Sequence, residues 1–223
     1  MNGSTPATAT NELPRGKFIS LEGGEGAGKS TLLAGLAAML GQRGVSLVQT
    51  REPGGTPLGE AVRSIVLDPA QRDITAEAEL LLMFASRAQL VREIIEPALA
   101  AGRSVLCDRF ADASYAYQGG GRGQPTPRIA ALEQWACAGL VPDLTLLLDL
   151  PVAAGRARAA GRGEADRIEN EADAFFERIR AAYRARAAAE PERFRVIDAS
   201  QSQAAVLEAA TRALAKLFDG RGA

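Results

Sequence analysis

A glycine-rich segment near the N-terminus has the residue types and spacing that bind the phosphates of a nucleoside triphosphate. Gly23, Gly28, Lys29 and Ser30 fit the phosphate-loop pattern, a glycine followed after four residues by Gly-Lys-Ser/Thr. Glycines let backbone N–H groups turn toward phosphate oxygens, the lysine meets the β- and γ-phosphates, and the serine hydroxyl is a ligand for Mg²⁺. The segment therefore predicts nucleotide binding.

The flanking residues supply the structural context that this motif requires. The apolar run that ends at Leu21 predicts a short buried strand before the loop. After the loop, apolar residues recur at helical spacing at Leu32, Leu33, Leu36, Met39 and Leu40. A helix that starts near Ser30 directs its positive end at the bound anion. The alternative is a plain glycine-rich turn between a strand and a helix, and it does not explain why both flanks and all fixed positions match.

Acidic residues at the ends of two later strands are candidates for the metal site. Residues 104–107 predict a buried strand that places Asp108 and Arg109 at its carboxyl end, where ligands bind in open α/β sheets. Asp149 closes the apolar run 144–149 and is a rival for the same role. We favour Asp108 because Arg109 beside it adds an anion-binding group.

Further arginines lie in two predicted loops. Arg51 and Glu52 follow a predicted strand at 45–50 and open a Pro-Gly-Gly turn, which is equally typical of a ligand-facing loop and of a solvated turn. A second group surrounds two glycines and consists of Arg156, Arg158, Arg162 and Arg167. A solvated cationic helix face is the alternative there. We favour a mobile lid at about 154–168 because a triphosphate requires charge neutralisation.

The composition excludes several other kinds of chemistry. The chain has 223 residues, a formal net charge of −1, no histidine and 2 cysteines. The lack of histidine excludes His-based triads and His-ligated metals. The near-zero net charge gives no general attraction to nucleic acid or to membranes. Cys107 and Cys137 have neither metal-site nor disulfide spacing, which favours a cytoplasmic setting.

The remaining pattern alternates strands and helices, which predicts a single α/β domain with a parallel sheet wrapped by helices. Residues 1–16 predict a disordered tail, so we expect the domain to span 17–219. Helices are expected at 57–67, 75–99 and 127–138, the last with Trp135 facing inward, and a late strand at 194–198. Residues 80–84 are apolar around most of their helix, which predicts that a subunit interface covers the second side.

The phosphate loop alone fits a kinase, a GTPase or a motor-type ATPase. No Asn-Lys-x-Asp guanine-reading motif occurs, and the arginines exceed what one triphosphate requires, which indicates a second phosphorylated ligand. Phe84, Tyr115 and Tyr117 offer flat surfaces for a base. Transfer to a monophosphate requires no strong base, because the acceptor oxygen is already anionic and the difficulty is to bring two anions together. A switch protein that uses the loop to control a partner is a second, non-catalytic hypothesis.

Several motifs taken together resemble the bacterial thymidylate kinase family. They are the segments 18–31, 50–56, 84–87, 108–110, 117–122, 166–169 and 196–200, which occur in the family's order. The resemblance implies a phosphate-loop NTPase fold of the nucleoside-monophosphate-kinase type, with a five-stranded parallel sheet flanked by helices, and a homodimer. It also implies Mg²⁺-ATP-dependent phosphorylation of dTMP to dTDP, a step of dTTP synthesis. A kinase for another nucleoside monophosphate is the alternative.

The resemblance also implies roles for individual residues. The expected ATP contacts are Gly23, Gly24, Glu25, Gly26, Ala27, Gly28, Lys29, Ser30 and Thr31, with Ser30 and Asp108 at the metal. The expected dTMP contacts are Glu25, Arg51, Glu52, Phe84, Arg87, Arg109, Ser114, Tyr117 and Gln118. In that set Phe84 stacks on thymine, Arg87 bonds the base O4, and Arg109 holds the acceptor phosphate.

The lid arginines place the sequence beside one branch of that family. Small residues and Glu25 occupy the phosphate-loop slot where the other branch carries an arginine. The resemblance therefore implies that the catalytic group is Lys29, Arg109, Asp108 and a lid arginine, with Arg158 and Arg162 as candidates and Arg167 as a structural residue. The segment 110–113 departs from the family pattern.

Overall fold

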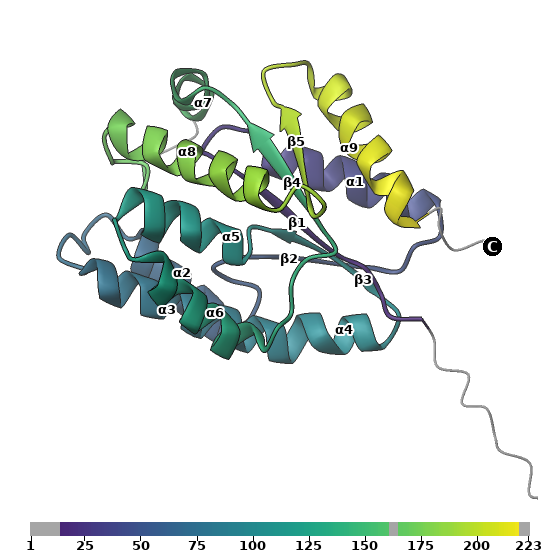
Figure 1. Ribbon diagram of the computed structural model, residues 1–223, viewed down its shortest axis with the longest axis horizontal. Helices are drawn as coiled ribbons and strands as arrows, with labels where there is room; N and C mark the ends of the chain where they lie inside the picture. The colour runs from purple at the N-terminus through teal and green to yellow at the C-terminus, as the bar shows by residue number, and fades with distance from the viewer. Residues whose placement is uncertain (1–13, 161–164, 219–223) are drawn as a thin grey trace, which may run out of the picture.

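The computed structural model describes residues 14–160 and 165–218 and contains a five-stranded sheet whose paired strands are all parallel (Figure 1). The strand order is β2-β3-β1-β4-β5. The strands are β1 Phe18–Gly23, β2 Leu47–Arg51, β3 Ser104–Asp108, β4 Leu144–Asp149 and β5 Phe194–Asp198. This confirms the predicted α/β phosphate-loop fold.

Helices fill the connections between the strands. They are α1 Lys29–Gln42, α2 Pro57–Leu67, α3 Ala76–Leu90, α4 Glu96–Ala100, α5 Ala111–Ser114, α6 Thr126–Cys137, α7 Val152–Ala159, α8 Asp173–Ala189 and α9 Gln203–Phe218. Two π-helical segments, η1 Val91–Ile95 and η2 Tyr115–Gly121, continue α3 and α5. The helix expected at 75–99 is therefore an α-helix, a π-helical turn and a second α-helix in succession.

Alternation along β1 divides its side chains between two layers of the fold. Ile19 and Leu21 are fully buried against helices α1 and α9, which lie side by side on one face of the sheet (Figure 1). Phe18, Ser20 and Glu22 point to the other face, because successive side chains of a strand alternate. That second face carries η1, α4, α5, η2 and α8 through the clusters around Phe18 and Leu147.

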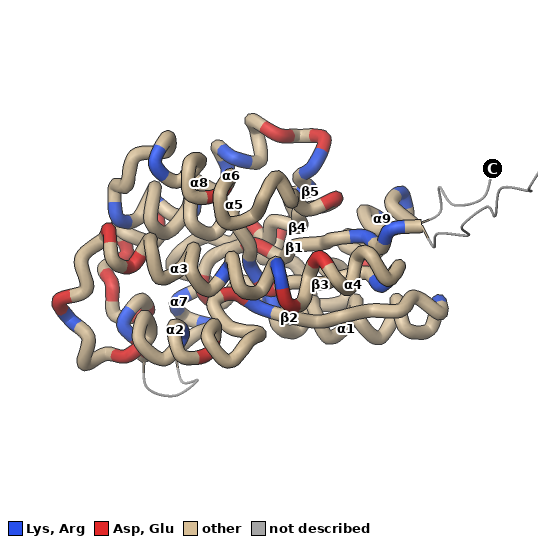
Figure 2. The backbone as a smooth tube through the Cα atoms, turned by 90° about the horizontal axis from the view of Figure 1, so that it is seen from below, with Lys and Arg blue, Asp and Glu red and all other residues tan. Residues whose placement is uncertain are grey.

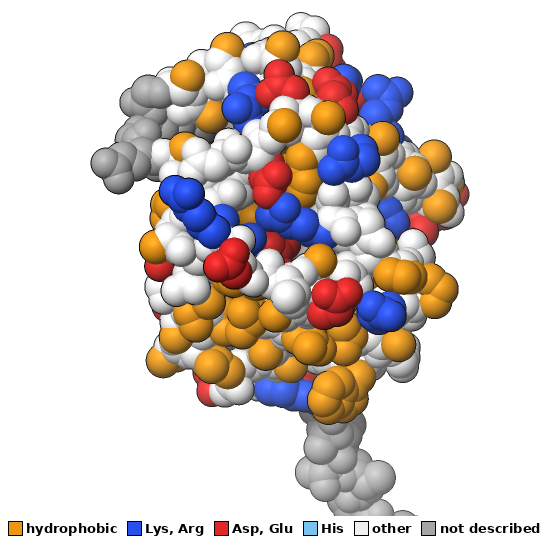
Figure 3. Space-filling view, turned by 90° about the vertical axis from the view of Figure 1, so that its left-hand side faces the viewer, with side chains coloured by type: hydrophobic (Ala, Val, Ile, Leu, Met, Phe, Trp, Pro, Cys, Tyr) orange, Lys and Arg blue, Asp and Glu red, His pale blue; other side chains and the backbone are white. Residues whose placement is uncertain are grey.

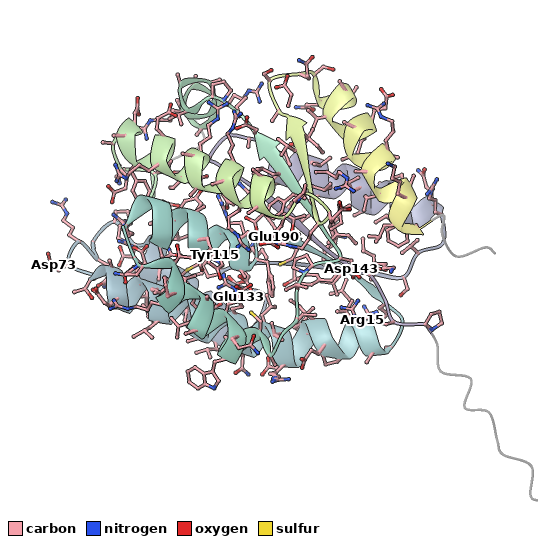
Figure 4. The ribbon with its side chains drawn as sticks, viewed as in Figure 1. Arg15, Asp73, Tyr115, Glu133, Asp143 and Glu190 are labelled. Carbon is pink, nitrogen blue, oxygen red and sulfur yellow. The ribbon has the colours of Figure 1, made fainter. Side chains whose placement is uncertain are left out.

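Polar contacts join the segment before β1 to the loop before β4. Arg15 Nη1 lies 3.0 Å from Asp143 Oδ2, and the backbone N–H of Phe18 donates to the same oxygen at 2.7 Å (Figure 4). These bonds fix where the first strand begins. The expected tail, residues 1–16, lies mostly outside the described residues.

Two expectations about helix faces are wrong or incomplete. Trp135 of α6 is 81% exposed, so it does not face inward as predicted. The apolar run of α3 is split, since Leu80, Met83 and Phe84 are buried whereas Leu81 is 56% exposed. A continuous apolar run does not show which of its residues face the core, because every residue in it is apolar enough to be buried.

Candidate active site

Predicted site residues at the ends of the strands come together at the carboxyl edge of the sheet. The parallel register pairs Asp108 with both Leu21 and Arg51, and Gly23 with Leu148, so four strand ends lie at one edge. Charged positions of both signs cluster around these strand ends (Figure 2). A cavity of about 410 Å³ opens there, and it extends from the phosphate loop to Glu79, Met83 and Gln118.

The phosphate loop is shaped by glycines at close approaches. Gly28 has φ 92° immediately before α1, and Gly26 has φ 70°. A Cβ at Gly26 would lie 2.0 Å from the carbonyl oxygen of Gly155 in α7, so any side chain there would displace the backbone. The loop therefore packs directly on the segment that begins the predicted lid.

Lys29 is held within the loop and is not paired to a carboxylate among the described residues. Its Nζ donates to the carbonyl oxygens of Gly23 and Gly24, each at 3.2 Å. Burial, followed by repulsion from Arg109, lowers the pKa of the Lys29 ammonium below its ordinary value. A buried cation bonded only to carbonyls is well placed to receive an anion.

Arg109 lies between the phosphate loop and the far end of the cavity. Its Nη2 lies 2.7 Å from Glu25 Oε1, and its Nη1 donates to Gly23 O at 3.0 Å and to the Tyr183 hydroxyl at 3.3 Å. The guanidinium lies 4.6 Å from the ring centre of Tyr117, whose hydroxyl donates to Glu25 at 3.0 Å. The expected residues Glu25, Arg109 and Tyr117 thus form one contact group.

The two rival aspartates differ in what surrounds them. Asp149 accepts two bonds from Arg180, at 2.7 and 3.1 Å, and one from Arg184 at 3.2 Å. Asp108 lines the cavity, and its Oδ1 is buried without a hydrogen-bond partner in the described part of the chain. A buried carboxylate oxygen without a donor is costly unless a ligand satisfies it. Asp108 and the exposed Ser30 hydroxyl, both oxygen donors on this cavity, suit Mg²⁺.

Arg87 is enclosed in a polar group beneath the cavity floor. Its Nε donates to Glu52 Oε2 at 2.7 Å, its Nη1 to Ser114 Oγ at 3.0 Å and its Nη2 to Phe110 O at 3.1 Å. Its side chain is 0% exposed, and Glu52 is the member of the group that lines the cavity. The expected contact between Arg87 and a base is therefore not preformed, and the same holds for Ser114, whose hydroxyl is buried against Arg87.

Phe84, the residue expected to stack on thymine, lies beside Arg87. Its ring is 3% exposed and packs with Leu80, Ile129 and other core residues, beneath the Arg87 guanidinium at 4.5 Å. Met83, one residue earlier, lines the cavity instead. Tyr115 also lies outside the cavity lining, since its hydroxyl donates to Glu133 of α6 at 2.6 Å (Figure 4). Phe84 and Tyr115 therefore do not line the cavity in this structure, and the stacking role of Phe84 stays a prediction.

Gln118 lies at the far end of the cavity, and only the nitrogen of its side-chain amide makes a hydrogen bond among the described residues. Its Nε2 donates to Glu79 Oε1 at 3.0 Å, which orients the amide, and its buried Oε1 has no partner among the described residues. The oriented oxygen is suited to accept a hydrogen bond from a ligand N–H group. Glu52 Oε1, also on the lining, is a second buried oxygen without a donor in that part of the chain.

Two arginines on the β2–α2 side complete the positive lining. Arg51 makes a double contact with Glu60, at 2.9 and 3.1 Å. Arg63 donates to Pro53 O at 3.2 Å and has no carboxylate within ion-pair distance among the described residues. Burial and then repulsion from Arg51 lower the pKa of Arg63. Arg63 is thus a candidate anion contact that the sequence gave no reason to single out, because it lies within an ordinary amphipathic helix.

The predicted lid arginines do not share one position. Arg158 lines a second cavity together with Gly26, Thr31, Ala199 and residues 201–204, and it donates to Ala199 O at 2.8 Å. Arg156 donates to Glu169 O and Glu171 O, at 3.3 and 3.0 Å. Arg167 bonds Val66 O at 2.8 Å and contacts Glu79, in keeping with its predicted structural role. Arg162 lies outside the described residues.

Several residues that line or support this site belong to no motif with a predicted role. Glu22, Met83 and Tyr183 are buried or nearly buried, and Glu79 binds Gln118, Arg122 and Arg167. Glu22 alone carried a signal, because a charged residue inside an apolar strand pattern requires a partner.

Comparisons with known proteins show which family this chain resembles. The model of the thymidylate kinase family matches residues 21–210. The chain is 55% identical over 204 residues to a thymidylate kinase of Pseudomonas syringae pv. tomato, covering 92% of this chain and 97% of that protein. It is 56% identical over 205 residues to a thymidylate kinase of Pseudomonas putida (strain GB-1), with 92% and 96% covered. It is 58% identical over 191 residues to one from Pseudomonas syringae pv. syringae, with 86% and 91% covered. A phosphate loop joined by one cavity to an arginine-rich pocket, in a chain this similar to these proteins, identifies it as a member of the thymidylate kinase family.

Proposed function

We propose that the chain transfers the γ-phosphoryl group of ATP to dTMP and releases ADP and dTDP, a step of dTTP synthesis. The observation that carries this proposal is the single cavity that joins the phosphate loop to Arg109 and then to Gln118. A donor phosphate at Lys29 and an acceptor phosphate at Arg109 would meet within it. Membership of the thymidylate kinase family supports dTMP as the acceptor.

The donor occupies the phosphate loop and the second cavity. Backbone N–H groups from residues 23–31 and the Lys29 ammonium bind the phosphates. The cavity lined by Arg158, Thr31, Ala199 and residues 201–204 adjoins the loop and takes the nucleoside. We therefore assign Arg158 to the donor nucleoside, in place of the transferring phosphoryl group that the sequence suggested. Arg162 stays the proposed lid arginine for phosphoryl transfer.

Mg²⁺ is the implied metal, and Ser30 and Asp108 are the residues that would hold it. The partnerless Oδ1 of Asp108 supports this assignment, whereas Asp149 is already bonded to two arginines. When bound, Mg²⁺ neutralises phosphate charge and orients the donor.

The acceptor phosphate binds Arg109, with Arg51 and Arg63 as further cations on the lining. Glu25 and Tyr117 hold the Arg109 guanidinium at the junction of the two phosphates. Glu25 and Tyr117 are then placed beside the deoxyribose. Because the acceptor oxygen is already anionic, these residues act by position and by charge, and no general base is required.

The base occupies the end of the cavity opposite the phosphate loop. Met83 supplies an apolar contact for its face, and Gln118 Oε1 accepts a hydrogen bond from its N–H edge. Glu52 Oε1 is available from the cavity floor, where Arg87, Ser114 and Phe84 support it. In this assignment Arg87 and Ser114 act through Glu52.

We further propose that two copies associate through helices α2, α3 and α6. Exposed hydrophobic side chains on these helices are Leu58, Ile65, Leu81 and Trp135. Hydrophobic side chains form a broad band below the charged groups on one face of the molecule (Figure 3). Burial of such a band between copies is favourable, because it removes apolar area from water.

No helix in the described part of the chain is long and apolar enough to cross a membrane. Cys107 and Cys137 are both free and buried. The two free thiols support a cytoplasmic location, which we propose for the chain.

The experiment that tests the proposal is product analysis with two variants. The purified chain with Mg²⁺, ATP and dTMP should form dTDP and ADP in equal amounts, separated by anion-exchange chromatography. Lys29→Ala should abolish product. Arg51→Ala should reduce it less than Arg109→Ala, because the Arg51 side chain is 54% exposed whereas that of Arg109 is 15% exposed. Absence of dTDP from the unaltered chain would overturn the proposal.

A further inference from the structure

Glu22 is a fully buried carboxyl group that the proposed reaction does not use directly. It is the last side chain of β1 before Gly23, on the face of the sheet that carries α5 and α8. Its Oε1 accepts the backbone N–H of Phe110 at 2.7 Å, and its Oε2 accepts the Tyr183 hydroxyl at 2.7 Å. Both partners belong to the surroundings of Arg109.

The first bond fixes the backbone of Arg109. Arg109 has φ 72°, a left-handed conformation that a residue with a side chain rarely adopts. Its own N–H donates to Leu21 O at 2.9 Å, and the next N–H, from Phe110, donates to Glu22. The peptides on both sides of Arg109 are therefore attached to the end of β1, which maintains the unusual conformation.

The second bond fixes the guanidinium. Arg109 Nη1 donates to the Tyr183 oxygen at 3.3 Å, and the Tyr183 hydroxyl donates in turn to Glu22. Tyr183 is 1% exposed, so its hydroxyl has no water to bond and its direction is set by Glu22. The bonds run in one direction, from the guanidinium through the tyrosine to the carboxyl group.

The charges around Glu22 make this arrangement compatible with an anionic substrate. The groups that face it are Asp112 on α5, Tyr183 on α8 and Arg109, with Lys29 and Cys107 farther away. Burial and then repulsion from Asp112 raise the pKa of Glu22 to about 8. Because its raised pKa favours the neutral form, Glu22 orients Arg109 while adding less negative charge beside it than the Glu25 carboxylate that Arg109 already contacts.

We propose that Glu22 is a positioning residue for the phosphoryl acceptor, which holds Arg109 for the acceptor phosphate through Phe110 N–H and the Tyr183 hydroxyl. The inference rests on the proposed function, since that function assigns the acceptor phosphate to Arg109. If Glu22 were purely structural, replacing it would lower the thermal stability and leave the affinity of the folded protein for dTMP unchanged.

The test compares Glu22→Ala, Glu22→Gln and Tyr183→Phe with Ser20→Ala as the matched control. Ser20 lies on the same face of the same strand, is fully buried and bonds Thr145 at 2.9 Å, away from Arg109. For each folded variant the Kd of dTMP is measured by titration calorimetry, the KM of dTMP and of ATP by steady-state kinetics, and the Tm by calorimetry.

Glu22→Ala should raise the Kd and KM of dTMP by about tenfold, because both bonds to the Arg109 surroundings are lost. The KM of ATP should change by less than about twofold, since the phosphate loop and Lys29 supply most of the contacts to the donor. Glu22→Gln should have a smaller effect, because its amide oxygen still accepts Phe110 N–H. Tyr183→Phe should weaken the binding of dTMP and leave the KM of ATP unchanged. An unchanged Kd of dTMP in Glu22→Gln and Tyr183→Phe, or equal effects in Ser20→Ala, overturns the inference.

The Arg109→Ala background separates failure of this inference from failure of the proposed function. If Arg109→Ala leaves the Kd of dTMP unchanged, the acceptor assignment itself is wrong. If Arg109→Ala weakens dTMP binding and Glu22→Gln weakens it further by its full factor, the function stands and the Glu22 inference fails. We expect Glu22→Gln to have almost no effect in that background, because the two residues act through the same contact.

Discussion

The position of Met83 on the cavity and of Phe84 in the core gives a sharp prediction about the base site. Met83 lines the far end of the acceptor cavity, whereas Phe84, about 100° farther round α3, packs with Leu80 and Ile129 in the core. A thioether against an aromatic ring contributes about 0.3–1.5 kcal/mol. Met83→Ala should therefore raise the Kd of dTMP by about twofold to thirteenfold.

The matched variant is Phe84→Leu, which keeps most of the buried volume. It should cost about 1 kcal/mol of unfolding free energy, which lowers the Tm by roughly 3 °C in a chain of this size. The Kd of dTMP should stay within about twofold of the original value, because the ring has no contact with the cavity. The affinities are measured by titration calorimetry well below both Tm values, so that loss of folded protein does not contribute.

One result would refute this reasoning. If Phe84→Leu weakens dTMP binding more than Met83→Ala does, while both variants are fully folded, the ring contacts the base. The helix would then have to present Phe84 to the cavity in the bound state, and the role that the sequence suggested for it would be restored.

Three further changes test other parts of the site. Arg109→Ala should abolish phosphorylation of dTMP, and ATP binding should be retained in nucleotide titrations. If ATP binding is lost as well, Arg109 serves both the donor and the acceptor parts of the site. Asp108→Asn should raise the Mg²⁺ concentration required for half-maximal activity, whereas Asp149→Asn should leave it unchanged. The opposite result would mean that Asp149, and not Asp108, holds the metal. The pKa of Glu22 is raised from its ordinary value near 4.5 to about 8 by burial and by Asp112, so the folded state binds the extra proton in that window. The unfolding free energy should then fall as pH rises from about 5 to 8, by at most about 1.4 kcal/mol per pH unit, and denaturant titrations of Glu22→Gln should lack this component.

The sheet and the phosphate-binding end of the site were predictable because their signals are local. Gly28, Lys29 and Ser30 form a contiguous motif, and the parallel sheet follows from alternating strands and helices. Asp108 and Arg109 follow a buried strand, so their place at the edge of the sheet required no long-range information.

The base end of the site was not predictable in the same way. Met83 and Phe84 are both apolar and adjacent, and a helix turns about 100° between them, so the pattern does not decide which one faces the cavity. Tyr115 and Gln118 lie in a π-helical segment, whose altered spacing changes which side chains share a face. The roles of Glu22 and Tyr183 depend on contacts 161 positions apart in the chain, which no local pattern contains.

The measurement that tests the central claim most directly is ADP release from ATP with Mg²⁺, in the presence of one monophosphate at a time. The acceptors are dTMP, dUMP, dCMP, AMP and GMP at equal concentration, with a reaction lacking any acceptor as the baseline. We predict turnover that depends on dTMP and that exceeds turnover with dCMP, AMP and GMP by a wide margin. Equal or faster turnover with one of those three would contradict the base assignment to Met83 and Gln118, and turnover independent of any acceptor would contradict the kinase assignment itself.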